Sequence, residues 1–134
     1  MTAYEYLNQI RLIEAKISML KKQIQKIEAR SRTAGMTEAQ RASLKDCQAK
    51  LIGLIMESAK RSGQIEETVE KAITDPREYK IILMRYWDAR SWYDIAREMA
   101  LESSLVYRLH RRALQRLAPY IAAQPESKQD GAEE

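Results

Sequence analysis

The sequence predicts an all-α protein in which a long helical hairpin or coiled coil precedes a smaller helical domain. Three observations support this prediction. Only four Gly and three Pro interrupt 134 residues that are rich in good helix formers. Near the N-terminus, apolar residues recur in alternating steps of four and three. Near the C-terminus, two amphipathic segments lie three residues apart.

Residues 3 to 30 form the first predicted helix, because their apolar positions repeat over about three heptads. These positions are Tyr6, Ile10, Ile13, Ile17, Leu20, Ile24 and Ile27. The other faces carry Arg11, Lys16, Lys21, Lys22, Lys26 and Arg30. Such basic faces indicate either simple exposure to solvent or a second surface that contacts phosphates.

A second predicted helix begins at the capping box Thr37-Glu-Ala-Gln40. Its apolar residues between Leu51 and Met56 spread around much of the helix, which predicts burial by more than one partner. One partner is the first helix, returning antiparallel; the other is the C-terminal domain or a second copy of the chain. Cys47 is expected to be a small core residue. Ser62-Gly63 is expected to kink or interrupt the helix.

A third helix is predicted to begin at Asp75-Pro76-Arg-Glu78 and to run to Tyr86 or Trp87. Asp75 is suited to cap the helix, and proline favours its first position. Glu78 stands where its carboxylate can reach back to the cap. Trp87 to Arg90 is expected to form a short loop.

The residues that follow predict a helix-turn-helix motif. Its first helix is expected from Trp92 to Met99 with Ser91 as N-cap, and its second from near Ser103 to Leu117. The three residues from Ala100 to Glu102 match the length of the turn in this motif. The second helix is apolar on one face, and its other face carries Arg108, Arg111, Arg112 and Arg116 with no acid. This combination favours insertion into a DNA groove.

The same residues resemble a known family. Pro76-Arg-Glu-Tyr-Lys-Ile-Ile-Leu-Met-Arg-Tyr86, Asp94-Ile-Ala96 and the apolar positions from Val106 to Leu117 resemble region 4 of bacterial primary sigma factors. The resemblance covers about a third of the chain. The segment from Ser91 to Leu114 is similar to sigma-like regulators of phages and prophages, in the style of late transcription activators of the ArpU and RinA type.

The resemblance implies which residues contact DNA. Base edges would be contacted by the first turns of the second helix, at Ser103, Ser104, Tyr107 and Arg108. Arg108 could pair with guanine in a bidentate contact worth ~1–3 kcal/mol of discrimination. Phosphates would be held by Arg111, Arg112 and Arg116, and by Ser91 with the amide end of the first helix.

Two residues depart from the family pattern. Ala100 stands where the turn often has glycine, and a left-handed backbone there would cost about 1 kcal/mol, so a differently built turn is expected. Glu102 occupies the usual cap position, which predicts that the cap shifts to Ser103.

The sequence indicates neither an enzyme nor a metal or cofactor site. His110 is the single histidine and has no cysteine at metal-ligand spacing, so it is expected to pack or to meet a phosphate. Trp87 and Trp92 are expected to pack rather than to stack on bases. One cysteine, no apolar run of ~20 residues and no signal-like N-terminus predict a cytoplasmic, soluble protein that does not enter membranes.

Three segments are therefore expected. Residues 1–73 form the helical hairpin for oligomerisation or partner contact, residues 74–118 the helix-turn-helix DNA-binding domain, and residues 119–134 a disordered acidic tail. The predicted function is sequence-specific binding of double-stranded DNA in transcription control, as a homo-oligomer with a dimer as the first hypothesis. Two alternatives stay open: a phage packaging protein like a small terminase subunit, and an RNA polymerase adaptor that makes no specific DNA contact.

Overall fold

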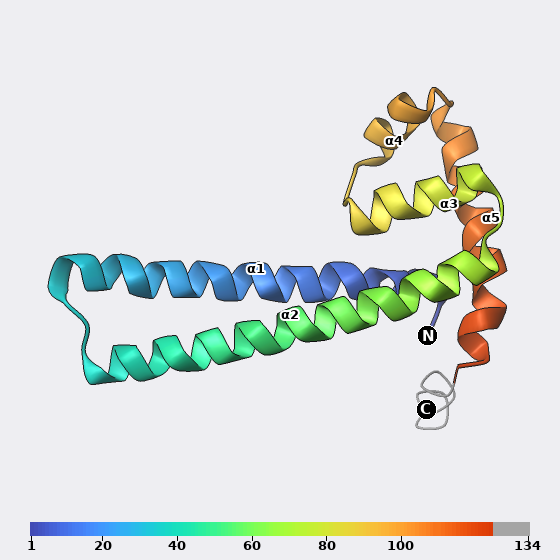
Figure 1. Ribbon diagram of the computed structural model, residues 1–134. Coiled ribbons are helices and arrows are strands. Elements are labelled where there is room, and N and C mark those ends of the chain that lie inside the picture. Colours follow the sequence, from blue (N-terminus) through green and yellow to red (C-terminus); the bar gives the residue numbers. More distant parts are fainter. Residues whose placement is uncertain (125–134) are drawn as a thin grey trace. The chain divides into compact units, whose positions relative to one another are not determined.

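In the computed structural model, residues 1–124 are described, and they form helices without any strand, which confirms the predicted all-α class. The elements are α1 (Ala3–Ala34), α2 (Glu38–Ala72), α3 (Pro76–Ile82), the π-helix η1 (Leu83–Trp87), α4 (Trp92–Met99) and α5 (Ser103–Ala122) (Figure 1). Over these residues, no helix has both the length and the apolar character needed to cross a membrane.

The chain divides into two compact units, but not at the expected boundary near residue 73. One unit comprises residues 12–61, and the other combines residues 1–11 with residues 62–124. The difference arises because the first turns of α1 bury Leu7 and Ile10 in the same core as α3 and α5. The N-terminal turns therefore belong structurally to the domain that was expected to begin at residue 74.

The unit of residues 12–61 is an antiparallel pair of helices, called the helix pair below. Gly35 adopts a φ of 74°, which ends α1 in a left-handed turn. The predicted capping box is confirmed: the Gln40 amide donates to Thr37 Oγ1 at 3.1 Å, and the Thr37 amide donates to Gln40 Oε1 at 2.9 Å. Along the seam Ile17 is buried, while its neighbours are only partly covered. The helix pair has a thin core.

The predicted interruption of the second helix is not found, since α2 continues through Ser62-Gly63 to Ala72. A Cβ added to Gly63 would meet no atom within 4 Å, so no close approach requires glycine there. The helix tolerates this glycine at a cost of about 1 kcal/mol relative to alanine.

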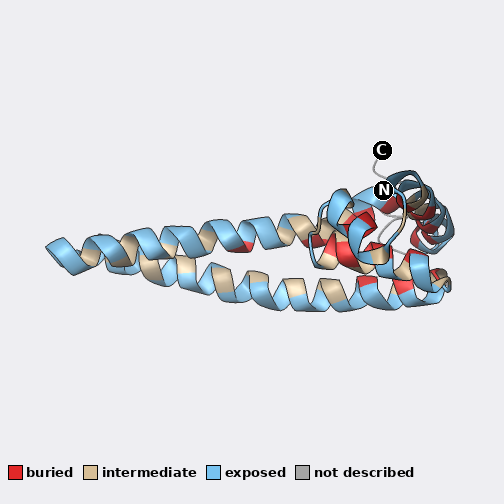
Figure 2. Cartoon of the chain, turned by 90° about the horizontal axis from the view of Figure 1, so that it is seen from above, coloured by how far each residue is buried: buried red, intermediate tan, exposed pale blue. Residues whose placement is uncertain are grey.

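The second unit has two adjoining apolar clusters, and its residues provide most of the buried positions coloured red in Figure 2. The first cluster joins the start of α1 and the end of α2 to Ile82, Tyr86, Leu117 and Ile121. The second is made by α3, η1, α4 and the first half of α5: Ile81, Met84, Ile95, Ala96, Val106 and Leu109. Because α5 contributes to both clusters, its orientation is fixed along its length.

The last helix extends beyond its expected end at Leu117. α5 continues to Ala122 with Pro119 inside it, and Ile121 is 1% exposed. Proline removes one helical hydrogen bond, but the burial of Ile121 next to Leu117 holds this final turn in place. Residues 119–122 are therefore part of the fold rather than of a disordered tail. The rest of the expected tail, from residue 125, lies outside the described residues.

The start of α3 is as predicted, but its end is not. Asp75 Oδ1 accepts hydrogen bonds from the amides of Glu78 (3.2 Å) and Arg77 (2.9 Å), and these amides, that of Glu78 most, lower the pKa of Asp75. After Ile82 the helix widens into η1, which is closed by the Asp88 amide donating to the Leu83 carbonyl at 3.1 Å. Propensity and periodicity contain no signal for this π turn.

Candidate nucleic-acid interface

The predicted first helix of the motif is confirmed at both ends. Ser91 Oγ accepts a hydrogen bond from the Asp94 amide at 3.1 Å, and α4 runs from Trp92 to Met99. Ser91 is exposed, at the amide end of α4. The side chain of Arg90 forms an ion pair with Glu98, which joins the residue before the cap to the last turn of α4.

The turn after α4 uses a left-handed residue, contrary to the expectation that Ala100 would force another geometry. Ala100 has φ 55° and ψ 43°. Its amide donates to the Arg97 carbonyl at 3.2 Å, and the Leu101 amide donates to the Ala96 carbonyl at 3.0 Å. These bonds satisfy carbonyls at the end of α4 and offset the cost of about 1 kcal/mol for left-handed alanine.

The expected caps of α5 were wrong. Its N-cap is Glu102, which has extended backbone angles and makes no side-chain capping bond, while Ser103 and Ser104 lie inside the helix. The Glu102 carbonyl accepts from the amides of Leu105 and Val106 at 3.0 and 3.1 Å. Because no side chain caps the first turn, the amides of Ser103 and Ser104 remain available to an external acceptor such as a phosphate.

Most of the predicted DNA-contacting residues share one exposed face of α5. Side chains opposite this face are buried in the core, namely Val106, Leu109, Ala113 and Leu117. The exposed residues are Ser103, Ser104, Tyr107, Arg108, Arg111 and Arg112. No acid occurs between Ser103 and Gln124, and within residues 1–124 none of Arg108, Arg111 and Arg112 is in an ion pair. All the charges on this face are therefore positive.

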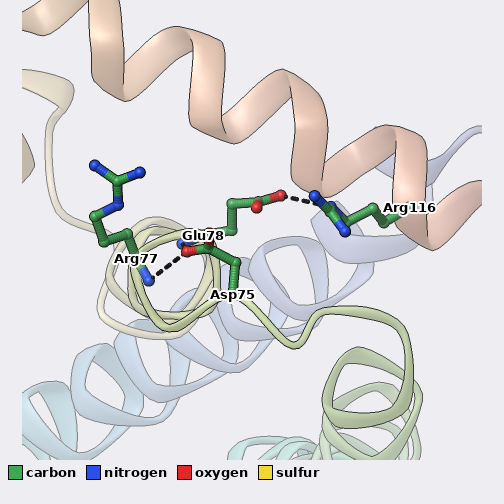
Figure 3. Close-up of polar contacts among 4 residues, drawn as sticks. All are labelled: Asp75, Arg77, Glu78 and Arg116. Atoms are coloured by element: carbon green, nitrogen blue, oxygen red, sulfur yellow. Dashed lines mark hydrogen bonds and ion pairs between the residues drawn. The ribbon is translucent and has the colours of Figure 1, made fainter.

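Arg116 is different, because it is held against the core. Its Nε donates to Oε1 of Glu78 at 3.0 Å, and the Glu78 side chain is 1% exposed against 48% for Arg116 (Figure 3). Glu78 therefore does not reach back to the cap of α3, as was predicted, but turns toward α5. Its second oxygen, Oε2, is buried without a hydrogen-bond partner in the described part of the chain. Arg116 primarily neutralises this buried carboxylate.

Aromatic residues beside the basic face form a contiguous cluster that includes a cation. The Arg85 guanidinium lies 4.5 Å from the Trp92 ring centroid. The Tyr107 ring also packs against Trp92, with 5.2 Å between the two ring centroids. His110 meets the Trp92 ring at 4.6 Å. Tyr107 is thus positioned by packing while remaining 46% exposed. Arg85 was not predicted as part of this region, since the π turn that places it has no sequence signal.

His110 packs, which is one of its two expected roles. Its Nε2 lies 2.8 Å from the Tyr86 hydroxyl, and the two rings stack at 5.8 Å. Burial, together with the nearby Arg85 charge, lowers the pKa of His110 to about 4. Burial raises the pKa of Tyr86 to about 12. At neutral pH the imidazole is therefore uncharged, and its tautomer sets which of the two groups donates in this hydrogen bond.

Both tryptophans pack within the second unit, as expected. Trp92 lies against the second apolar cluster, and Trp87 lies against the first while its Nε1 donates to Ser62 Oγ at 2.9 Å.

The described residues contain no cluster of three or more His, Cys, Asp or Glu that could hold a metal ion. What the arrangement supplies is an exposed helix face with hydrogen-bond donors, positive charge and the exposed ring of Tyr107, backed by a packed core. Comparisons with protein-family models, with curated proteins and with solved structures find no match to the chain.

Proposed function

We propose that α4, its turn and α5 form a helix-turn-helix, and that the protein binds double-stranded DNA sequence-specifically as a transcription regulator of the phage or prophage type. The observation that carries the proposal is the exposed face of α5, which presents Tyr107, Arg108, Arg111 and Arg112 without an opposing acid. An α-helix fits the major groove, where base edges are distinguishable. The buried face of α5 keeps these side chains in one orientation.

The positions along α5 suggest a division of roles. Ser104, Tyr107 and Arg108 lie in its first turns, close to the end that approaches base edges in this motif. Arg108 would contact guanine, and Arg111 and Arg112 would hold phosphates. The uncapped amides at Ser103 and the exposed N-terminus of α4 at Ser91 would receive further phosphates.

Arg116 enters the proposal with a changed role. Its bond to Glu78 supports a positioning function, in which it holds α5 against α3, rather than the direct phosphate contact first expected.

Self-association through the helix pair is part of the proposal. Ile52, Ile55 and Met56 are 60%, 46% and 68% exposed and lie on one face of α2 together with Ala59. A second copy packed antiparallel about a two-fold axis between residues 55 and 56 would place each Ile52 opposite Ala59 of its partner, large against small. Such a dimer would pair two recognition helices on DNA.

The dimer is tested by sedimentation of Met56→Glu, with Leu12→Glu as the matched control. Leu12 is 57% exposed but lies on α1. We expect Met56→Glu to dissociate the dimer and Leu12→Glu to leave it intact. Assembly into a larger ring would instead favour the packaging alternative.

DNA binding is tested with duplex fragments from the genomic region around the protein's own coding sequence, at ~0.05 and ~0.2 M salt. The proposal predicts that at least one fragment stays bound at the higher salt. The proposal would be contradicted if every fragment bound equally and all binding were lost at the higher salt concentration. Insensitivity of all interactions to Arg108→Ala and Arg112→Glu would favour the polymerase adaptor.

A further inference from the structure

The helix pair has a larger net positive charge than the entire chain. Residues 12–61 hold eleven Lys and Arg against five Asp and Glu, a net charge of +6, whereas the whole chain has +4. The excess therefore does not come from α5, whose basic residues lie outside this range. A net positive charge concentrated in this unit is either screened by the solvent or neutralised by an anionic partner.

One groove in the helix pair collects hydrogen-bond donors on both helices. It has a volume of about 300 Å³ and is lined by Gln23, Lys26, Ile27 and Arg30 from α1 and by Ser43 and Cys47 from α2. Lys26 and Arg30 are one helical turn apart, so their side chains leave α1 on the same side. Within residues 1–124 neither forms an ion pair.

The chemistry of the lining selects an oxyanion. Lys and Arg are donors only, and the Gln23 amide and Ser43 hydroxyl can add further donors from either wall. No carboxylate lines the groove, so nothing repels a negative charge. Arginine and lysine side by side are the usual ligands of phosphate in proteins.

We propose that this groove binds a backbone phosphate of duplex DNA and gives the protein a second, sequence-independent contact. The choice of DNA as the source of the phosphate rests on the proposed function of α5, while the groove itself is built from other residues. A membrane surface is the less favoured source. A helix that lies on a membrane buries large apolar side chains beside its basic ones, and the groove has Ile27 as its single large apolar side chain.

The first test compares two double variants of the full-length protein on a duplex of random sequence. Lys26→Gln with Arg30→Gln removes the two groove cations, and Lys16→Gln with Lys60→Gln removes two exposed cations of the helix pair that do not line the groove. Glutamine keeps helix propensity, so both variants should fold, which circular dichroism checks. We expect the groove variant to lower the slope of log K against log salt by about 1 to 2, and the control by less.

The outcome is distinguishable from failure of the proposed function. If the groove binds phosphate, its double variant weakens binding to all duplexes equally and leaves the preference between sequences unchanged. Equal salt slopes for the two double variants would overturn the proposal even if Arg108→Ala still abolished sequence preference. Conversely, the groove variant could lower the salt slope while the wild-type protein shows no preference between sequences. That result would support phosphate binding by the groove and contradict base reading by α5.

A second test needs no substitution. Cys47 is the single cysteine, is partly exposed and lines the groove. Bound duplex should slow its alkylation by a neutral maleimide severalfold, and the groove variant should lose this protection. An unchanged alkylation rate would overturn the proposal. Protection by vesicles of anionic phospholipid but not by duplex would show the phosphate source to be lipid and would overturn it as well.

Discussion

Arg116 on α5 donates a hydrogen bond to Glu78 on α3 across a distance of 3.0 Å, and it is the ion-pair partner of a carboxylate that is otherwise enclosed. Glu78 lies three residues after the Asp75 cap, so the pair joins the beginning of α3 to the second half of α5. The remaining oxygen of Glu78 has no hydrogen-bond partner among the described residues. The Arg116 guanidinium therefore provides most of the compensation for burying the negative charge of Glu78.

Arg116→Ala should destabilise the fold much more than Arg112→Ala. Removing Arg116 leaves a buried carboxylate unpaired, which costs about 3 kcal/mol. Arg112 is exposed and outside any ion pair in residues 1–124, so its loss should change the free energy of unfolding by less than about 0.5 kcal/mol. Urea unfolding followed by circular dichroism measures both. Equal costs would show that the pair does not stabilise the fold.

Acidification should destabilise the protein through His110. Its pKa is about 4 in the folded state against 6.5 for the free side chain, so the unfolded chain binds a proton more readily between these values. Stability is therefore full above about pH 6.5 and decreases as the pH falls toward 4. Allowing for solvent screening of a partly exposed ring, the loss should be about 2 kcal/mol or less.

The control is His110→Phe, which keeps a ring but cannot be protonated. Carboxylates also titrate near the lower limit, so the contribution of His110 is the difference between the two pH profiles of stability. Superimposable profiles would be inconsistent with a buried, neutral His110.

Ala100→Gly should stabilise the protein, although glycine usually destabilises helical proteins. The left-handed angles of Ala100 strain a residue with a Cβ, and glycine removes strain of about 1 kcal/mol, partly offset by its greater freedom in the unfolded chain. Ala118→Gly, at an exposed position within α5, is the matched control and should cost about 1 kcal/mol. Thermal unfolding should give shifts of opposite sign; shifts of the same sign would contradict the turn geometry.

The two helix starts of the proposed motif should respond differently to loss of a serine. Ser91→Ala removes a capping bond and should cost about 1 kcal/mol, while Ser103→Ala removes none and should be nearly neutral. Glu102→Ser would supply the missing cap and should stabilise α5. Chemical denaturation of the three variants provides the comparison. A large cost at Ser103 would mean that the cap lies there after all.

Local signals in the sequence predicted three of the helix starts. The caps at Thr37, Asp75 and Ser91 were predicted because short side chains accept bonds from amides two or three residues away. The buried face of α5 followed from its 3.6-residue period. The exposed basic face, the candidate site itself, follows from the same periodicity.

Features that depend on distant partners were not predictable from one sequence. Glu78 obeys the capping-box spacing, but the burial of its side chain beside Arg116 outweighs that local preference. The π turn at Leu83–Trp87 has the composition of an ordinary helix. It is stabilised because Tyr86 is buried in the first apolar cluster and Trp87 packs against that cluster. The heptads of α1 run unbroken from Tyr6 to Ile27, so they do not reveal that its first turns pack in the second unit.

The most direct measurement is the ratio of affinities for a selected operator duplex and its scrambled counterpart, determined for wild type, Arg108→Ala and Arg112→Ala. If α5 reads bases, Arg108→Ala should reduce the ratio by about fivefold or more, corresponding to ~1–3 kcal/mol. Arg112→Ala should weaken both affinities and keep the ratio. An unchanged ratio in Arg108→Ala, with a wild-type ratio near unity, would contradict sequence-specific binding by this helix.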